Sequence, residues 1–186
     1  MGFSTMTTGT VSERERAILL SFAQRIDPGD AGARNNLGVL YFRRGLAEEA
    51  VQQFQRAIEL MPGDPRAYQW YANSFEDDLE REQEGLALLR KAIELDPLDP
   101  LFRHQVARHL SRINHFPEAE RELRIALDLD PGYFPARQWM DFVMAGQGRL
   151  DEAYYWAEQA TEADPNSPFT GIGQLFIAVD LQDRPR

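Results

Sequence analysis

Residues 48–65 read EEAVQQFQRAIELMPGDP, and this stretch decides the fold. Its apolar side chains Ala50, Phe54, Ala57 and Leu60 recur three or four residues apart, which places them on one stripe of an α-helix. The Pro-Gly-Asp at 62–64 then ends the helix, because proline cannot continue it. The stretch therefore predicts an amphipathic helix with a defined end.

The same pattern returns along the whole chain. A proline closes each copy, at Pro28, Pro62, Pro97, Pro131 and Pro165. The spacings between these prolines are 34, 35, 34 and 34 residues. A fixed period of this size is typical of stacked repeats, in which each unit buries its apolar face only against its neighbours. No alternating run rich in Val, Ile and Thr indicates a strand, so we predict an all-α chain.

The period divides the chain into helix pairs, each with a helix A followed by a helix B. We expect four full pairs, at 31–64, 65–99, 100–133 and 134–167. A lone helix B at 12–29 precedes them, opened by a capping box from Ser12 to Glu15. A closing helix at 168–182 follows them, and short tails at 1–11 and 183–186 complete the chain, the first of them disordered.

Two places within the pairs depart from the regular repeat pattern. The acidic connection at 77–84 carries the inserted residue of the 35-residue period, and we expect it to be a solvated loop. Gly38 stands in the middle of a helix, where glycine is unfavourable. We therefore predict that two helices approach closely at Gly38.

Composition limits the class of function. The formal net charge of −10 opposes nonspecific binding to nucleic acid or to anionic membranes, so we expect neither as a partner. No apolar run approaches the ~18 residues of a membrane-spanning helix. The polar start MGFSTMTTGT does not resemble a signal peptide. We expect a soluble, cytoplasmic protein without membrane insertion.

No motif indicates catalysis. The chain has no cysteine, which excludes disulfides, thiolate zinc sites and cysteine nucleophiles. His104 and His109 are five residues apart and so face different sides of one helix. No H-E-x-x-H, P-loop, G-x-S-x-G or G-x-G-x-x-G motif is present. We predict that the chain is not an enzyme and needs no cofactor or metal.

The repeated residues resemble those of the tetratricopeptide repeat (TPR) family, whose 34-residue helix–turn–helix carries small and large apolar residues at fixed positions. The large-then-small pair of helix A is Leu37-Gly38, Tyr71-Ala72, Val106-Ala107 and Met140-Asp141. The small residue early in helix B is Ala50, Gly85, Ala119 and Ala153, and its closing alanine is Ala57, Ala92, Ala126 and Ala160. The resemblance implies a right-handed α-α superhelix, a single TPR solenoid over 12–182 with its A helices on the concave side.

The chain departs from the family pattern mainly in the fourth pair. Asp141 replaces the small residue there, and Ala157 replaces a large one. The family's aromatic residue near the start of helix A is present only as Tyr68, and the other pairs have Arg34, Arg103 and Arg137. We expect the fourth pair to pack loosely or at a changed angle.

The resemblance also implies a binding groove lined by turn-spaced positions of helix A. Carried onto this chain, these positions are Asn35, Val39, Phe42, Gln69, Asn73, His104, Arg108, Arg112, Gln138 and Phe142. Amide side chains both donate and accept, so they can hold the backbone of an extended peptide. The span 100–114 has no acidic residue, so Arg108, Arg112 and His104 predict an acidic side chain or C-terminal carboxylate as ligand. Trp70 and Trp139 are candidate aromatic anchors.

The family's carboxylate clamp for chaperone tails is absent. Asn35 and Val39 stand where its first Lys and Asn are expected, and Leu101 and Gln105 replace its later Lys and Arg. We predict a protein–protein interaction scaffold that binds an extended, acidic segment of an unidentified protein or peptide partner in its groove. Two alternatives stay open. One is an assembly protein that forms a homo-oligomer through its open terminal helices, and the other is the non-catalytic recruitment part of a larger protein.

Overall fold

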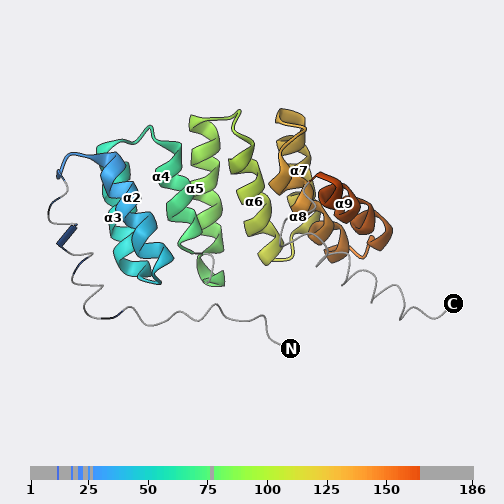
Figure 1. Ribbon diagram of the computed structural model, residues 1–186, viewed down its shortest axis with the longest axis horizontal. Helices are drawn as coiled ribbons and strands as arrows, with labels where there is room; N and C mark the ends of the chain where they lie inside the picture. The colour runs from blue at the N-terminus through green and yellow to red at the C-terminus, as the bar shows by residue number, and fades with distance from the viewer. Residues whose placement is uncertain are drawn as a thin grey trace. The chain divides into compact units, whose positions relative to one another are not determined.

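The computed structural model describes residues 27–75 and 78–163, together with Ser12, Ile18, Ser21, Phe22 and Arg25. Its regular elements within these residues are all helical (Figure 1). They are α2 (Ala31–Arg43), α3 (Ala47–Leu60), α4 (Pro65–Asn73), the 3₁₀ helix η1 (Leu79–Arg81), α5 (Glu82–Leu95), α6 (Pro100–Arg112), α7 (Phe116–Leu129), α8 (Phe134–Gly146) and α9 (Leu150–Ala163). The predicted all-α repeat architecture is confirmed. The expected closing helix at 168–182, both tails and nearly all of the lone helix B at 12–29 lie outside the described residues.

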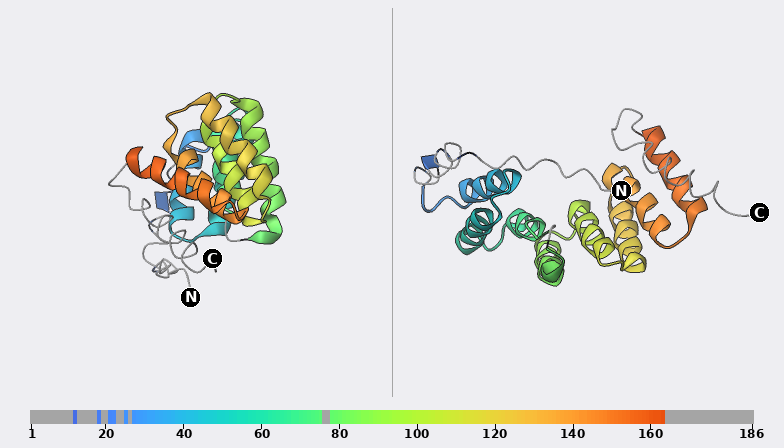
Figure 2. Two further views of the ribbon diagram at one scale, coloured as in Figure 1. Left: turned by 90° about the vertical axis from the view of Figure 1, so that its right-hand side faces the viewer. Right: turned by 90° about the horizontal axis from the view of Figure 1, so that it is seen from below.

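The helices fall into two compact units, Met1–Leu95 and Asp96–Arg186. In the first unit α2 packs on α3 and α4 packs on α5, while α3 joins the two pairs by packing on α4. The second unit repeats this order, with α6 on α7, α8 on α9 and α7 against α8. Figure 2 shows the hairpins of each unit from two further directions. Within each unit the A helices, α2 and α4 or α6 and α8, also contact each other.

Aspartates determine where three of the A helices begin. The side chains of Asp30, Asp64 and Asp99 accept hydrogen bonds from backbone N–H groups in the first turn, each at 2.9 Å. Such N-caps satisfy donors that have no partner within the helix. Helix α8 differs, because its N-cap residue Tyr133 makes no side-chain capping bond.

A left-handed residue separates helix A from helix B in three pairs. Gly45, Asn114 and Gly148 have φ values of 72°, 60° and 73°, and they stand at equivalent positions before α3, α7 and α9. Glycine and asparagine tolerate this conformation best. In the second pair the 3₁₀ helix η1 occupies the corresponding place.

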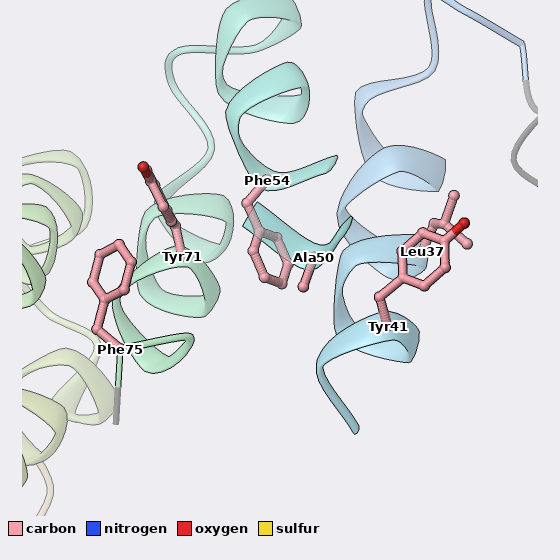
Figure 3. Packing of buried hydrophobic residues seen from close by; sticks show 6 residues of the cluster. All are labelled: Leu37, Tyr41, Ala50, Phe54, Tyr71 and Phe75. Atoms are coloured by element: carbon pink, nitrogen blue, oxygen red, sulfur yellow. The ribbon is translucent and has the colours of Figure 1, made fainter. Parts of the chain in front are cut away.

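The core of the first unit is a row of apolar side chains drawn from three helices and from Phe75, two residues after the end of α4. Its buried members are Leu37, Tyr41, Ala50, Phe54, Tyr71 and Phe75. Figure 3 shows Leu37 and Tyr41 at one end of this cluster, Tyr71 and Phe75 at the other, and Ala50 with Phe54 between them. The predicted stripe on α3 is largely confirmed, since Ala50, Phe54 and Ala57 are at most 1% exposed while Leu60 is half-buried.

Two glycines mark places where helices come unusually close. A Cβ atom at Gly38 would lie 2.5 Å from Cε1 of Phe54, and one at Gly146 would lie 2.5 Å from Cε1 of Phe116. Real Cβ atoms essentially never approach a neighbour this closely. The prediction of a close helix approach at Gly38 is therefore confirmed, and the same device recurs between α7 and α8.

The prediction of a solvated loop at 77–84 is wrong only in part, because residues 78–80, 83 and 84 are exposed as expected. Part of the segment forms η1, and Glu82 begins α5 with only 1% of its surface exposed. Arg81 binds the Glu84 carboxylate at 2.8 Å and stacks 3.7 Å from the centre of the Phe75 ring. The Arg81 side chain folds back onto the core because its guanidinium group can contact a carboxylate and an aromatic ring at once.

Arginine replaces the family's aromatic residue by bonding within the pair. Arg34 donates to Oε1 of Gln53 at 3.0 Å, and Arg103 donates to Oε2 of Glu122 at 2.9 Å, both across a 19-residue step from helix A to helix B. Each bond joins the two helices of its pair, as an aromatic wedge otherwise would. Arg137 instead donates to the carbonyl of Pro131.

Candidate functional site

The predicted site residues of the first unit lie on its two A helices. Asn35, Val39 and Phe42 belong to α2, and Gln69 and Asn73 belong to α4. The three amides are 8%, 3% and 5% exposed, which makes them part of the packed interior. Val39 and Phe42 are half-buried against the apolar cluster, and the Phe42 ring lies 6.4 Å from that of Trp70, centre to centre.

Two of these buried amides have an oxygen without a hydrogen-bond partner. They are Oδ1 of Asn35 and Oδ1 of Asn73. A buried acceptor without a donor costs about 1–3 kcal/mol, so proteins rarely retain one without a reason. Both atoms stand on the A helices of one unit.

The predicted residues of the second unit lie on α6 and α8. His104, Arg108 and Arg112 are on α6, and Gln138 and Phe142 are on α8. His104 is 8% exposed, and its ring meets the rings of Tyr133 and Trp139 edge-on at 5.9 and 6.2 Å. Its Nδ1 has no hydrogen-bond partner, and neither does the buried Nε2 of Gln138.

Beside His104, an arginine and two aromatic rings form one continuous surface. The Trp139 ring lies 5.2 Å from that of Phe142, and the guanidinium carbon of Arg108 lies 5.6 Å from the centre of the Trp139 ring. Phe142 is 49% exposed although its ring also contacts Phe116 at 6.1 Å. We call Arg108, Trp139 and Phe142 the aromatic–arginine face.

Burial shifts the pKa of two groups near this face in opposite directions. Burial first, and then the charge of Arg108, lower the pKa of His104 to about 3. The imidazole is therefore neutral near pH 7 and offers hydrogen bonds, while the positive charge of α6 belongs to its arginines. Burial raises the pKa of Asp141 to about 6, although the N–H of Phe142 donates to its carboxylate and opposes the shift.

Comparison with known proteins points to one family. A tetratricopeptide repeat family model matches residues 15–65. A crystal structure of MamA is 17% identical, with a TM-score of 0.67, and the match covers 88% of this chain and 97% of that one. YrrB, described as a TPR protein with an unusual peptide-binding site, is 22% identical, with a TM-score of 0.63 and coverages of 88% and 85%. The chain thus contains a tetratricopeptide repeat at residues 15–65 and shares the fold of these proteins.

A further similarity concerns PilF of Pseudomonas aeruginosa. Its structure has a TM-score of 0.73 at 20% identity, covering 82% of this TPR protein and 69% of that chain. At such identities the likeness is one of fold. The family resemblance predicted from the repeated residues is confirmed.

Neither a metal centre nor a membrane span is found in the part of this TPR protein that the structure describes. No group of three or more His, Asp or Glu side chains there could hold a metal ion. No helix there is long and apolar enough to cross a membrane.

Sequence reasoning missed the residues that fix the aromatic–arginine face. Nε1 of Trp139 donates to Oγ of Ser111 at 3.3 Å, across 28 residues of sequence. Phe116 and Tyr133 supply the other ring contacts. None of the three belongs to a groove position of the family pattern, and only their location in space reveals the connection.

Proposed function

We propose that this TPR protein is an interaction scaffold that binds an extended segment of a partner protein along its A helices. One observation carries the proposal. Asn35, Asn73, His104 and Gln138 each bury a polar atom that has no hydrogen-bond partner, and each stands on a different A helix. Within the described ranges no side chain of a B helix has such an atom.

An extended peptide matches this distribution chemically. Its backbone presents N–H and C=O groups at a rise of about 3.3 Å per residue, so one segment can meet polar side chains on both A helices of a unit. An amide oxygen accepts from a peptide N–H, and an amide nitrogen donates to a peptide carbonyl. Such contacts hold a backbone with little regard to its side chains.

The charge of the second unit favours an acidic segment. Helix α6 carries Arg103, Arg108 and Arg112 and no acidic residue, in a chain of net charge −10. Arg103 binds Glu122, and Arg108 and Arg112 are the arginines that we propose to contact the ligand. Guanidinium groups bind carboxylates through paired, charge-assisted hydrogen bonds. YrrB, similar in fold, is described with a peptide-binding site, which agrees with the proposal.

The test measures binding of the protein to an array of 12-residue peptides with blocked ends. Each acidic peptide of the array has a basic counterpart of otherwise identical sequence. We expect acidic peptides to retain the protein and the Asn73→Ala variant to lose most of that binding. Gln52→Ala is the matched control, because Gln52 is an exposed amide on the B helix α3. Equal retention of basic peptides, or equal binding by Asn73→Ala and wild type, overturns the proposal.

A further inference from the structure

The aromatic–arginine face is a rigid surface, because each of its side chains is held by neighbours. The indole of Trp139 donates to Ser111, whose hydroxyl in turn donates to the Ala107 carbonyl at 2.7 Å. Nη1 of Arg108 donates to Oε1 of Gln105 at 3.1 Å, which holds one end of the guanidinium group in place. Preorganised side chains lose little conformational entropy when a ligand binds.

This rigid surface nevertheless exposes a large apolar side chain. Phe142 is 49% exposed, while Met140, Val143 and Met144 of the same helix are fully buried. Its ring contacts those of Trp139 and Phe116 and still remains half exposed, so an aromatic side chain of a partner can pack on the exposed part. Aromatic pairs stabilise a contact beyond the effect of their buried area, which makes such a position a suitable anchor.

A second observation points to a ligand at the same place. His104 is more than nine-tenths buried, contacts Trp139 edge-on and has an Nδ1 atom without a hydrogen-bond partner. Gln138, the residue before Trp139, buries an Nε2 atom without a partner. Two unmatched polar atoms beside exposed aromatic surface suit a ligand that has a polar backbone and an apolar side chain.

The charges around the face select the kind of ligand. Arg108 stands over the Trp139 ring, and the acid-free helix α6 adds Arg112 one turn further on. On α8 the charged groups are Arg137, bonded to the Pro131 carbonyl, and the half-buried Asp141. The charge that lies over the Trp139 ring is therefore that of the Arg108 guanidinium.

We propose that the aromatic–arginine face anchors one aromatic side chain of the acidic partner segment, with a carboxylate two residues away bound by Arg108. The inference rests on the proposed function and names the residue pair that the partner must present. Side chains two positions apart in an extended chain lie on the same side, about 7 Å from each other. This separation suits the 5.6 Å between the Arg108 guanidinium carbon and the Trp139 ring centre.

The probe is the blocked peptide acetyl-Gly-Ser-Phe-Ser-Asp-Ser-Gly-amide, titrated into the full chain by calorimetry and by NMR of the tryptophan indole N–H groups. We expect the Trp139 indole signal to shift and those of Trp70 and Trp156 to stay in place. Replacing Phe of the peptide by Ala should weaken binding roughly tenfold, as loss of a hot-spot side chain does. Replacing its Asp by Asn should weaken binding about fivefold, because the charge-assisted bond is lost.

Protein variants separate the two halves of the anchor. Arg108→Gln should abolish the preference for the Asp peptide over the Asn peptide and keep the preference for Phe over Ala. Phe142→Ala should do the reverse. Arg121→Gln and Tyr155→Ala are matched controls, since they remove a 70% exposed arginine side chain and a 54% exposed tyrosine elsewhere in the same unit.

Three results would each overturn the inference. They are an unmoved Trp139 signal at ~1 mM peptide, equal binding of a peptide with Lys in place of Asp, and equal effects of Arg121→Gln and Arg108→Gln. If the indole signal shifts with protein concentration instead, a second copy of the chain occupies the face and the inference also fails. The proposed function would still stand if acidic peptides of the array bind the protein and Asn73→Ala weakens that binding. Only the anchor at the aromatic–arginine face would then be ruled out.

Discussion

The backbone of Gly38 lies directly against the ring of Phe54, so close that a Cβ atom at residue 38 would be 2.5 Å from Cε1 of that ring. Phe54 is fully buried and belongs to the central cluster of the first unit. A small residue on α2 and a large one on α3 therefore determine how closely these two helices pack. The fourth pair has the opposite combination, Asp141 and Ala157, at the equivalent positions of α8 and α9.

We expect Gly38→Ala to destabilise the protein, although alanine is the better helix former. The gain in helix propensity is at most about 1 kcal/mol, while overpacking a buried site costs about 1–3 kcal/mol. Urea unfolding should show a net loss of about 1 kcal/mol. Gly63→Ala is the control, because a Cβ atom there meets nothing within 4 Å. Restored stability in Gly38→Ala with Phe54→Leu would identify the clash as the cause, and an unchanged midpoint for Gly38→Ala would contradict it.

Asp141 should destabilise the folded state at neutral pH. Its pKa is raised to about 6 from 3.8, so between these values the folded protein holds a proton that the unfolded chain has released. Stability therefore falls as pH rises through this range, and the whole loss is present above pH ~6. For a half-buried group the loss is on the order of 1–2 kcal/mol.

Asp141→Asn measures this effect without changing side-chain size. We expect the variant to be more stable than wild type at pH 7.5 and nearly equal to it at pH 4, as followed by urea unfolding. Asp128→Asn, at an exposed position of α7, controls for the general change in charge. A gain of the same size at both pH values would show that packing, and not ionisation, is responsible.

His104 should make the protein sensitive to acid. Its pKa is lowered to about 3 from 6.5, so between these values the unfolded chain binds a proton that the folded protein does not. Stability is then lost as pH falls below 6.5, by about 1.4 kcal/mol for each pH unit from this residue alone. His104→Asn should therefore unfold at lower pH than wild type.

Thermal melts at pH 7.5, 6 and 5 compare the two proteins, with His115→Asn, at an exposed position, as the control. At each lower pH, wild type should lose more free energy of unfolding than His104→Asn does. Parallel stability curves would contradict a buried neutral imidazole.

Local pattern was enough to predict the repeat. The stripe of Ala50, Phe54 and Ala57 follows from helical periodicity, and the stop at Pro62 follows from proline's missing N–H. Gly38 in mid-helix was informative for the same reason, since only a close contact explains a residue that weakens the helix. Each of these inferences concerns residues within one repeat, whose spacing the sequence displays directly.

The connection at 77–84 could not be predicted in this way. Its charges indicated a segment exposed to solvent. In the structure Arg81 contacts Glu84 and the Phe75 ring, and Glu82 is buried. The stability of a charged side chain depends on the partners that surround it, and these partners are set by how neighbouring helices pack.

The sequence by itself determined the helices, their order in pairs and the apolar stripes on which they pack, because these follow from the 3.6-residue turn and the 34-residue period. Only the tertiary structure decided that Asn35 and Asn73 are buried with unmatched oxygens, that His104 is neutral, and that Ser111 and Phe116 fix Trp139 and Phe142. Burial, pKa and ring contacts depend on distances between residues far apart in the chain, which no local pattern encodes.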